Sequence, residues 1–439
     1  MAEDSHSLGT PDRGSTSEGA IGAPPPFKLL FLVMLTIAAG NTALQSVLPA
    51  LGRSLGVPDA AVGAAFSVSA LVWVISAPLW ARRSDRQGRR KMVLLGLFGF
   101  CASVSLCGIF LAAGILGWIA PLTAFGGFIL ARMIYGLFGA AAPPAAQAIV
   151  AAGTTRDDRT RALTLLASAF GLGTILGPAL APFFVLPVVG LAGPAFVFAA
   201  FGVGVTVVVA RLLPNDVPGG AGGAATSYPS IGGEPTGASV RAATAEDRGR
   251  SLPITEARIW PWMLVGLVTG HAQAMIGQAM GFLIIDQLQV SAIQAATETG
   301  VVLMVGAGAA LLAQWGIIPN LKLAPRELAI SGSVLAAIGC VLTGFAHSLH
   351  MLAVSYGLAC LGFGFLRPGF TAGASLAVGQ HEQGAVAGRT TSVNGAAFVL
   401  GPSIGVGLYS VWGPLPYFTS AAALLLMLPY LVLRLKPVD

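Results

Sequence analysis

The segment ARRSDRQGRRK, residues 81–91, joins the apolar runs 61–80 and 92–116. Each run has the roughly 20 apolar residues that an α-helix needs to cross the hydrocarbon core of a bilayer. The segment between them carries six basic residues and one acid, which hydrocarbon does not accommodate. Positively charged segments resist translocation and stay on the cytoplasmic side. We therefore expect two membrane helices joined by a short cytoplasmic loop.

The rest of the chain continues this pattern. Hydrophobic residues make up 55% of the sequence and charged residues only 10%, and the mean hydropathy is +0.79, which a soluble globule with a charged surface cannot have. The fold class we predict is an all-α integral membrane protein with twelve transmembrane helices. The predicted spans are residues 29–49, 61–80, 92–116, 125–148, 162–184, 191–212, 259–285, 297–318, 328–346, 351–378, 390–411 and 415–433.

The positive charge lies almost entirely on one side of these spans. Of the 24 Lys and Arg residues, all but Arg53, Arg132 and Arg367 fall in the loops and tails of the side that holds both termini. We therefore expect cytoplasmic N- and C-termini. The net charge of +6 does not indicate nucleic-acid binding, because the basic residues are scattered through short loops without interleaved aromatics. The preponderance of Arg over Lys suggests a GC-rich bacterial genome, hence a bacterial plasma (inner) membrane.

The composition divides the chain into four parts. Residues 1–26 form a polar tail, and a stretch rich in Gly, Ala, Ser and Pro, residues 213–258, is typical of a flexible linker. They flank two predicted six-helix bundles, residues 27–212 and 259–435. The string FGLGTILGPALA at 170–181 aligns with NGAAFVLGPSIG at 394–405. This weak repeat predicts two pseudo-symmetric halves with a substrate site between them, unless Gly- and Pro-rich apolar helices resemble each other by chance.

The charged loop at 81–91 resembles the loop between helices 2 and 3 of the major facilitator superfamily. The matching residues are Asp85, Arg86, Gly88, Arg89 and Arg90, while Ala81 stands where the family prefers Gly. The resemblance implies that this loop is a gate that latches the two halves together in the outward-facing state. Without the resemblance, a run of charges is an ordinary solvated loop.

Two further motifs point to one branch of that family. Arg132 begins a small-residue pattern that is similar to the family's fourth-helix motif. Gly173, Gly177 and Pro178 are similar to the antiporter motif of helix 5. Gly401 and Pro402 repeat Gly177 and Pro178 in the second half. The resemblance implies a twelve-helix drug:proton antiporter of the tetracycline and multidrug efflux type. It places Arg132 near the proton-handling site; alternatively, Arg132 snorkels to the outer interface.

Other polar groups inside the spans are candidates for the substrate cavity. Asn41 and Gln45 share one helix face, His271 lies close to Gln273 and Gln278, and Arg367 adjoins a proline and several glycines. An intramembrane ionisable group usually faces a cavity or a polar partner. His271 is a second proton-coupling candidate because imidazole exchanges protons near neutral pH. Each of these residues is alternatively a structural group that hydrogen-bonds between helices.

No Asp or Glu lies in the middle of any predicted span, which argues against cationic substrates. We expect a secondary transporter that exports a small amphipathic molecule by alternating access, coupled to proton influx. The alternatives are an uncoupled or narrow-specificity metabolite or siderophore exporter, and a nontransporting receptor-like member of the fold. No nucleophile elbow or metal-ligand cluster indicates an enzyme, a metal site or a cofactor. The expected partners are the substrate, protons and lipid, and the family suggests a monomer.

Overall fold

The computed structural model describes residues 25–154, 156–215, 253–321, 323–379 and 382–435. The predicted tail 1–26 and the predicted linker 213–258 therefore lie largely outside the described residues. Within the described ranges the chain is helical apart from short connections and an isolated bridge between Leu186 and Gly190.

The N-terminal half contains seven α-helices and two short 3₁₀ turns. They are α1 (Pro25–Ser54), α2 (Asp59–Gln87), α3 (Arg89–Ile115), α4 (Pro121–Phe138), η1 (Gly139–Ala141), α5 (Ala142–Ala152), α6 (Arg156–Leu180), η2 (Ala181–Phe184) and α7 (Gly193–Leu212). The C-terminal half follows the same plan. It contains α9 (Trp260–Leu288), α10 (Ala292–Leu311), the π-helical turn η4 (Leu312–Ile317), α11 (Ile318–Leu321), α12 (Pro325–Gly344), α13 (Leu349–Leu376), α14 (Gln383–Val411) and α15 (Leu415–Arg434).

These helices make twelve transmembrane segments, because α4–α5 and α10–α11 each form one interrupted segment. Ten segments of the described chain are long and apolar enough to cross a membrane by composition alone. The other two are α6 and α9, which pack against α1 and α14. The predicted all-α fold with two pseudo-symmetric six-helix bundles is confirmed. The fourth segment differs from a continuous helix: Pro143 and Pro144 lack the N–H that continues an α-helix, and the turn before them is 3₁₀.

In each half, a close-packed glycine brings together two helices, and the two helix pairs are equivalent. A Cβ on Gly177 of α6 would lie 2.2 Å from the carbonyl oxygen of Ala39 in α1. A Cβ on Gly401 of α14 would lie 2.5 Å from the Cβ of Ala274 in α9. Backbones approach this closely only where one residue has no side chain. The repeated glycines therefore position the fifth and eleventh segments against the first and seventh.

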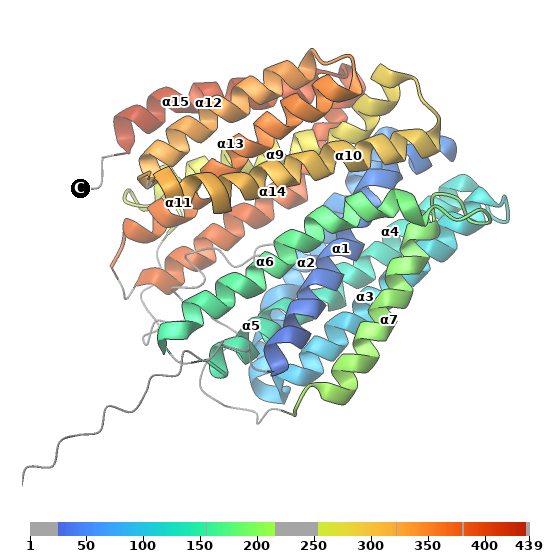
Figure 1. Ribbon diagram of the computed structural model, residues 1–439, viewed down its shortest axis with the longest axis horizontal. Coiled ribbons are helices and arrows are strands. Elements are labelled where there is room, and N and C mark those ends of the chain that lie inside the picture. The colour runs from blue at the N-terminus through green and yellow to red at the C-terminus, as the bar shows by residue number, and fades with distance from the viewer. Residues whose placement is uncertain (1–24, 155, 216–252, 322, 380–381, 436–439) are drawn as a thin grey trace, which may run out of the picture.

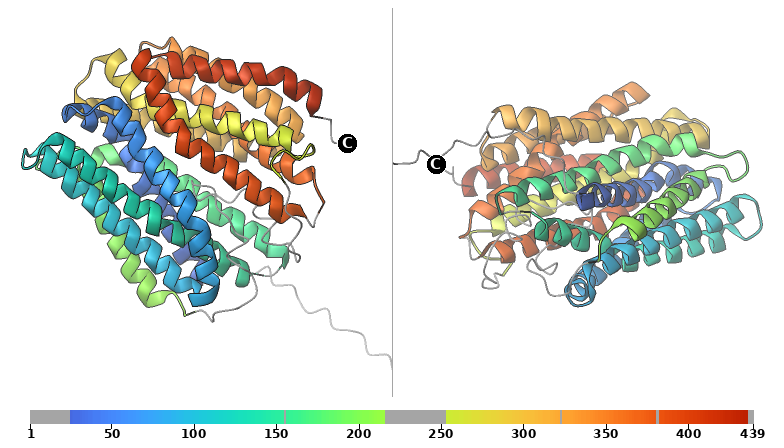
Figure 2. Two further views of the ribbon diagram at one scale, coloured as in Figure 1. Left: turned by 180° about the vertical axis from the view of Figure 1, so that it is seen from behind. Right: turned by 60° about the horizontal axis from the view of Figure 1, so that its bottom comes forward.

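The two halves form separate groups of helices that meet at one end. Figure 1 shows α1–α7 (blue to green) diverging from α9–α15 (yellow to red), and the view from behind in Figure 2 keeps the same separation. We call the end with the α2–α3 turn and the end of α15 the basic face, and the other end the opposite face. Contacts between the halves lie toward the opposite face: the Ser67 and Ser403 hydroxyls are 2.8 Å apart. The halves splay apart toward the basic face.

Candidate substrate cavity and gates

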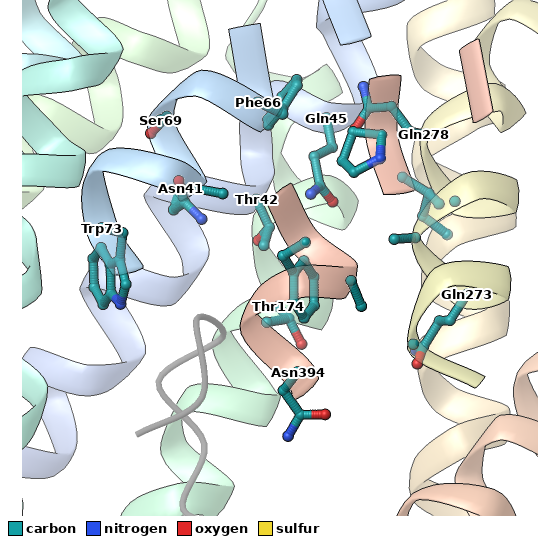
Figure 3. Close-up of a pocket in the computed structure, with 18 of the residues that line it drawn as sticks. Asn41, Thr42, Gln45, Phe66, Ser69, Trp73, Thr174, Gln273, Gln278 and Asn394 are labelled. Atoms are coloured by element: carbon teal, nitrogen blue, oxygen red, sulfur yellow. The ribbon is translucent and has the colours of Figure 1, made fainter. Parts of the chain in front are cut away.

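A cavity of about 260 Å³ lies between the two halves. Its walls come from α1, α2, α4 and α6 on one side and from α9, α10, α13 and α14 on the other (Figure 3). The polar and charged lining residues are Asn41, Thr42, Gln45, Ser69, Arg132, Thr174, Thr269, Gln273, Gln278, Arg367 and Asn394. The aromatic lining residues are Phe66, Trp73, Tyr135, Phe170, Tyr356, Phe370 and Phe398. Pockets with many apolar walls and a few polar groups typically bind small organic molecules.

Six of the polar and charged residues singled out from the sequence line this cavity. They are Asn41, Gln45, Arg132, Gln273, Gln278 and Arg367. Figure 3 shows Asn41 and Gln45 on the opposite side of the cavity from Gln273. His271 is not among the lining residues. Its Nδ1 lies 2.7 Å from the carbonyl oxygen of Leu267 in the same helix, the arrangement of a structural histidine.

Arg132 is held in the wall close to two aromatic rings. Its side chain is 4% exposed, and its Cζ lies 4.8 Å from the centre of the Phe66 ring and 5.7 Å from that of Tyr135. A Ser69 hydroxyl donates to the Arg132 carbonyl at 3.1 Å and joins α2 to α4 at this level. The rings stabilise the charge by cation–π attraction, but the buried Nε has no hydrogen-bond partner in the described structure. The burial does not fit an arginine that snorkels to the interface.

Several buried polar atoms of the lining lack partners, and sequence reasoning missed three of the residues that carry them. Trp73 Nε1, Thr269 Oγ1 and Asn394 Nδ2 are buried without a hydrogen bond, as are Asn41 Oδ1 and Gln278 Nε2. Buried polar groups in proteins are nearly always satisfied. Groups without a protein partner are usually satisfied by ordered water or by a ligand. Polar residues within apolar spans were the available signal, and Asn394 in particular lies at the start of the repeated string.

Arg53 anchors a second polar cluster, which closes the opposite face. Arg53 at the end of α1 donates to both carboxylate oxygens of Asp59 in α2, at 3.1 and 2.7 Å. It also donates to both oxygens of Asp286 in α9, at 2.9 Å for the Nη2 bond. The Tyr409 hydroxyl donates to Asp286, and the Arg53 guanidinium lies 5.3 Å from the Phe282 ring centre. The sequence signal was that Arg53 is the lone cation of its face.

Comparisons with known proteins agree with this architecture. Residues 30–319 match the sequence profile of the Major Facilitator Superfamily. The chain belongs to the major facilitator superfamily. The tetracycline resistance protein of class D from Salmonella ordonez is 34% identical over 35% of this chain and 37% of its own length. The staphyloferrin B transporter of Staphylococcus aureus is 29% identical over 35% of this chain and 34% of its own length. The chain thus matches about a third of the length of these relatives.

The likeness of fold extends along most of the chain. The crystal structure of the human organic anion transporter MFSD10 (TETRAN) superposes with a TM-score of 0.60 and 20% identity. The superposition covers 93% of this chain and 99% of that one. This chain is therefore a multi-pass membrane protein with the major facilitator fold.

The major facilitator loop motif forms the turn between α2 and α3. Gly88 has φ +98°, a conformation that residues with a Cβ rarely adopt, which explains glycine at this position. The Arg89 guanidinium donates to the carbonyl of Ala148 at 3.2 Å, and Arg90 donates to the Ala210 carbonyl. Both acceptors belong to the N-terminal half. Arg86 lies exposed near the end of α2, and the side chain of Asp85 lies outside the described structure.

The prolines that follow the paired glycines face the other half. A Cβ on Gly300 of α10 would lie 2.7 Å from the carbonyl oxygen of Pro178 in α6. A Cβ on Gly63 of α2 would lie 3.0 Å from the carbonyl oxygen of Pro402 in α14. In both repeats the glycine therefore packs within its own half while the next residue contacts the partner half. Gly173 extends the same packing, since its Cβ would lie 2.5 Å from the Leu35 carbonyl oxygen.

Among the described residues no group of three or more His, Cys, Asp or Glu side chains is arranged to hold a metal ion. The four cysteines are free and buried in the helices. The residues of the cavity can bind, orient and release a solute; they offer hydrogen-bond donors, two guanidinium groups and aromatic faces rather than an activated nucleophile.

Proposed function

We propose that this transporter exports a small amphipathic molecule by alternating access. The observation that carries the proposal is the cavity shared by the two halves, with a hydrogen bond and an ion pair that join the halves on the side of the opposite face. Transporters of this architecture move a solute by rocking one half against the other about such a site. The two curated relatives, one a resistance protein and one a transporter by name, support export.

The basic face is the cytoplasmic face in this proposal. Cytoplasmic loops carry an excess of Lys and Arg, and the α2–α3 turn, Arg258 and Arg434 all lie at the basic face. The described conformation is then open to the cytoplasm and closed to the outside. The tail, the linker and both termini are cytoplasmic, and the chain resides in a bacterial inner membrane as a monomer.

The α2–α3 turn acts as the cytoplasmic gate. In the described conformation Arg89 and Arg90 bond carbonyl groups of α5 and α7. Closing the basic face would bring the turn, with Asp85, Arg86 and Gly88, against the C-terminal half, where new charge-assisted bonds form. The latch then stabilises the outward-facing state and its release returns the protein to the state described.

Proton influx drives export in this proposal. A gradient does work only if protonation changes the relative stability of the two states. Arg132 holds its charge under all physiological conditions, so its part is to stabilise the charge of a neighbouring group or ligand. His271 is the titratable candidate; it lies in α9 between the lining residues Gly270 and Gln273. Its bond to Leu267 supports a structural role instead, so the two residues must be tested separately.

The test is proton flux in inverted membrane vesicles that contain the full chain. A pH-sensitive dye reports proton release when anionic, neutral or cationic lipophilic compounds are added to native protein and to Arg132→Ala, His271→Gln and Arg211→Ala. Arg211 is an exposed arginine at the end of α7, outside the cavity, and serves as the matched control. The proposal is supported if a compound causes proton release by the native protein, if Arg132→Ala abolishes this release and if Arg211→Ala retains it. No release with any compound, from folded protein, overturns proton-coupled export.

A second candidate is a narrow-specificity metabolite or siderophore exporter without proton coupling. Two observations favour it. The first is the likeness to the staphyloferrin B transporter. The second is a cavity of about 260 Å³, which is below the roughly 300–1,000 Å³ typical of pockets for drug-sized ligands. Radiolabelled solute efflux without a dye response distinguishes this candidate. A nontransporting, receptor-like protein would give neither signal.

A further inference from the structure

The cavity carries positive charge from both halves and, among the described residues, no negative charge. Arg132 lies in α4 and Arg367 in α13, and both line the cavity. No Asp or Glu is among the lining residues that the structure describes. In a site partly screened from water, two guanidinium groups repel a cationic solute and attract an anionic one, because charges interact more strongly at low dielectric.

Arg132 is built to receive a ligand. The residue is only 4% exposed, and its Nε donor has no acceptor in the described structure. A buried charge is normally paired, because leaving it unpaired is costly. The guanidinium Cζ lies close to the rings of Phe66 and Tyr135, and Arg132 is among the residues that line the cavity. A carboxylate binds to the N–H edge of a guanidinium in the plane of the group with two parallel hydrogen bonds.

Other donors point to the same ligand chemistry. Trp73, Gln278 and Asn394 line the cavity, and the buried atoms Trp73 Nε1, Gln278 Nε2 and Asn394 Nδ2 have no acceptor in the described structure. Trp73 comes from α2 of one half and Asn394 from α14 of the other (Figure 3). The indole N–H and the guanidinium can only donate, whichever way the amides are turned. A ligand that satisfies them must bring acceptor oxygens.

We propose that the transported solute is an amphipathic organic anion, whose carboxylate binds the N–H edge of Arg132 and whose apolar body packs on the cavity's aromatic rings. This inference rests on the proposed export function and names its substrate class. Phe66 and Tyr135 hold the guanidinium, while Phe170, Phe370 and Phe398 supply apolar wall on both sides of the cavity. A membrane potential that is negative at the cytoplasmic face favours outward movement of such an anion.

The test uses three probes of one shape and different charge: naphthoate, naphthamide and naphthylmethylammonium. Binding to the purified full chain in lipid nanodiscs is measured by calorimetry for native protein, Arg132→Gln, Arg132→Lys and Arg211→Gln. We expect naphthoate to bind native protein at least about tenfold more tightly than either other probe, in line with one charge-assisted pair at 1.4 kcal/mol per tenfold. Arg132→Gln should lose that preference while Arg211→Gln keeps it, and Arg132→Lys should retain part of it.

Each result has a defined meaning. If naphthoate does not bind folded protein, if the amide or the cation binds as tightly, or if Arg132→Gln keeps the preference, the inference is overturned. Unchanged naphthamide affinity and thermal unfolding in Arg132→Gln verify that the variant is folded. If only cationic compounds cause proton or solute flux and carboxylates do not bind, the anion site is overturned. The proposed export function is then still supported. Carboxylate binding without any flux supports the site and overturns export.

Discussion

The ion pair between Arg53 and Asp286 should bias the protein toward closure of the opposite face. It joins α1 of one half to α9 of the other, 233 residues apart, through both carboxylate oxygens. The Asp286 side chain is 46% exposed, so the pair belongs with solvent-screened pairs worth about 0.2–1 kcal/mol. Its two-bond geometry places it near the upper end, at about 1 kcal/mol. Asp286→Asn should therefore raise the ratio of open to closed opposite faces about fivefold.

The assay is a distance distribution between spin labels on cysteines introduced at Ala60 and Val411. These exposed positions lie at the start of α2 and the end of α14, one in each half at the opposite face. In Asp286→Asn the longer-distance population should grow, and high salt should weaken the native pair and reduce the difference. Asp59→Asn is the matched control, because Asp59 bonds the same arginine within the N-terminal half.

Two results would refute this reasoning. The first is a distribution for Asp286→Asn that matches the native one. The second is a shift in Asp59→Asn as large as that in Asp286→Asn, which would mean that the position of Arg53, rather than the bond between halves, controls the opening.

Three further variants test the packing and the turn. Gly177→Ala should lower stability by about 1–3 kcal/mol in thermal unfolding, because its Cβ would meet the Ala39 carbonyl; Gly204→Ala, with nothing within 4 Å, should change little. Gly88→Ala should destabilise by about 1–3 kcal/mol, since φ is +98° there; unaltered unfolding would show that the turn can relax. Ser67→Ala removes a hydrogen bond between the two halves, which is worth about 1 kcal/mol. In the same spin-label assay it should raise the ratio of open to closed opposite faces about fivefold. An unchanged distance distribution would contradict this.

Much of the cavity was predictable because polar side chains are rare in membrane spans. Asn41, Gln45 and Arg132 stand out in apolar runs, and all three line the cavity. Trp73 was not predictable, because an aromatic residue in a span is equally suited to lipid, core or cavity. His271 shows the converse: a polar residue in a span can bond its own helix backbone and stay out of the lining.

The sequence by itself determined the fold class. The length of an apolar run decides whether a helix can cross the bilayer, and the repeated glycines mark where helices approach. Only the tertiary structure decided which residues meet across the halves, such as Arg53 with Asp286, and which end is closed. The reason is physical: hydrophobic periodicity acts within one helix, whereas pairing between helices depends on their packing and on a rocking equilibrium worth only a few kcal/mol.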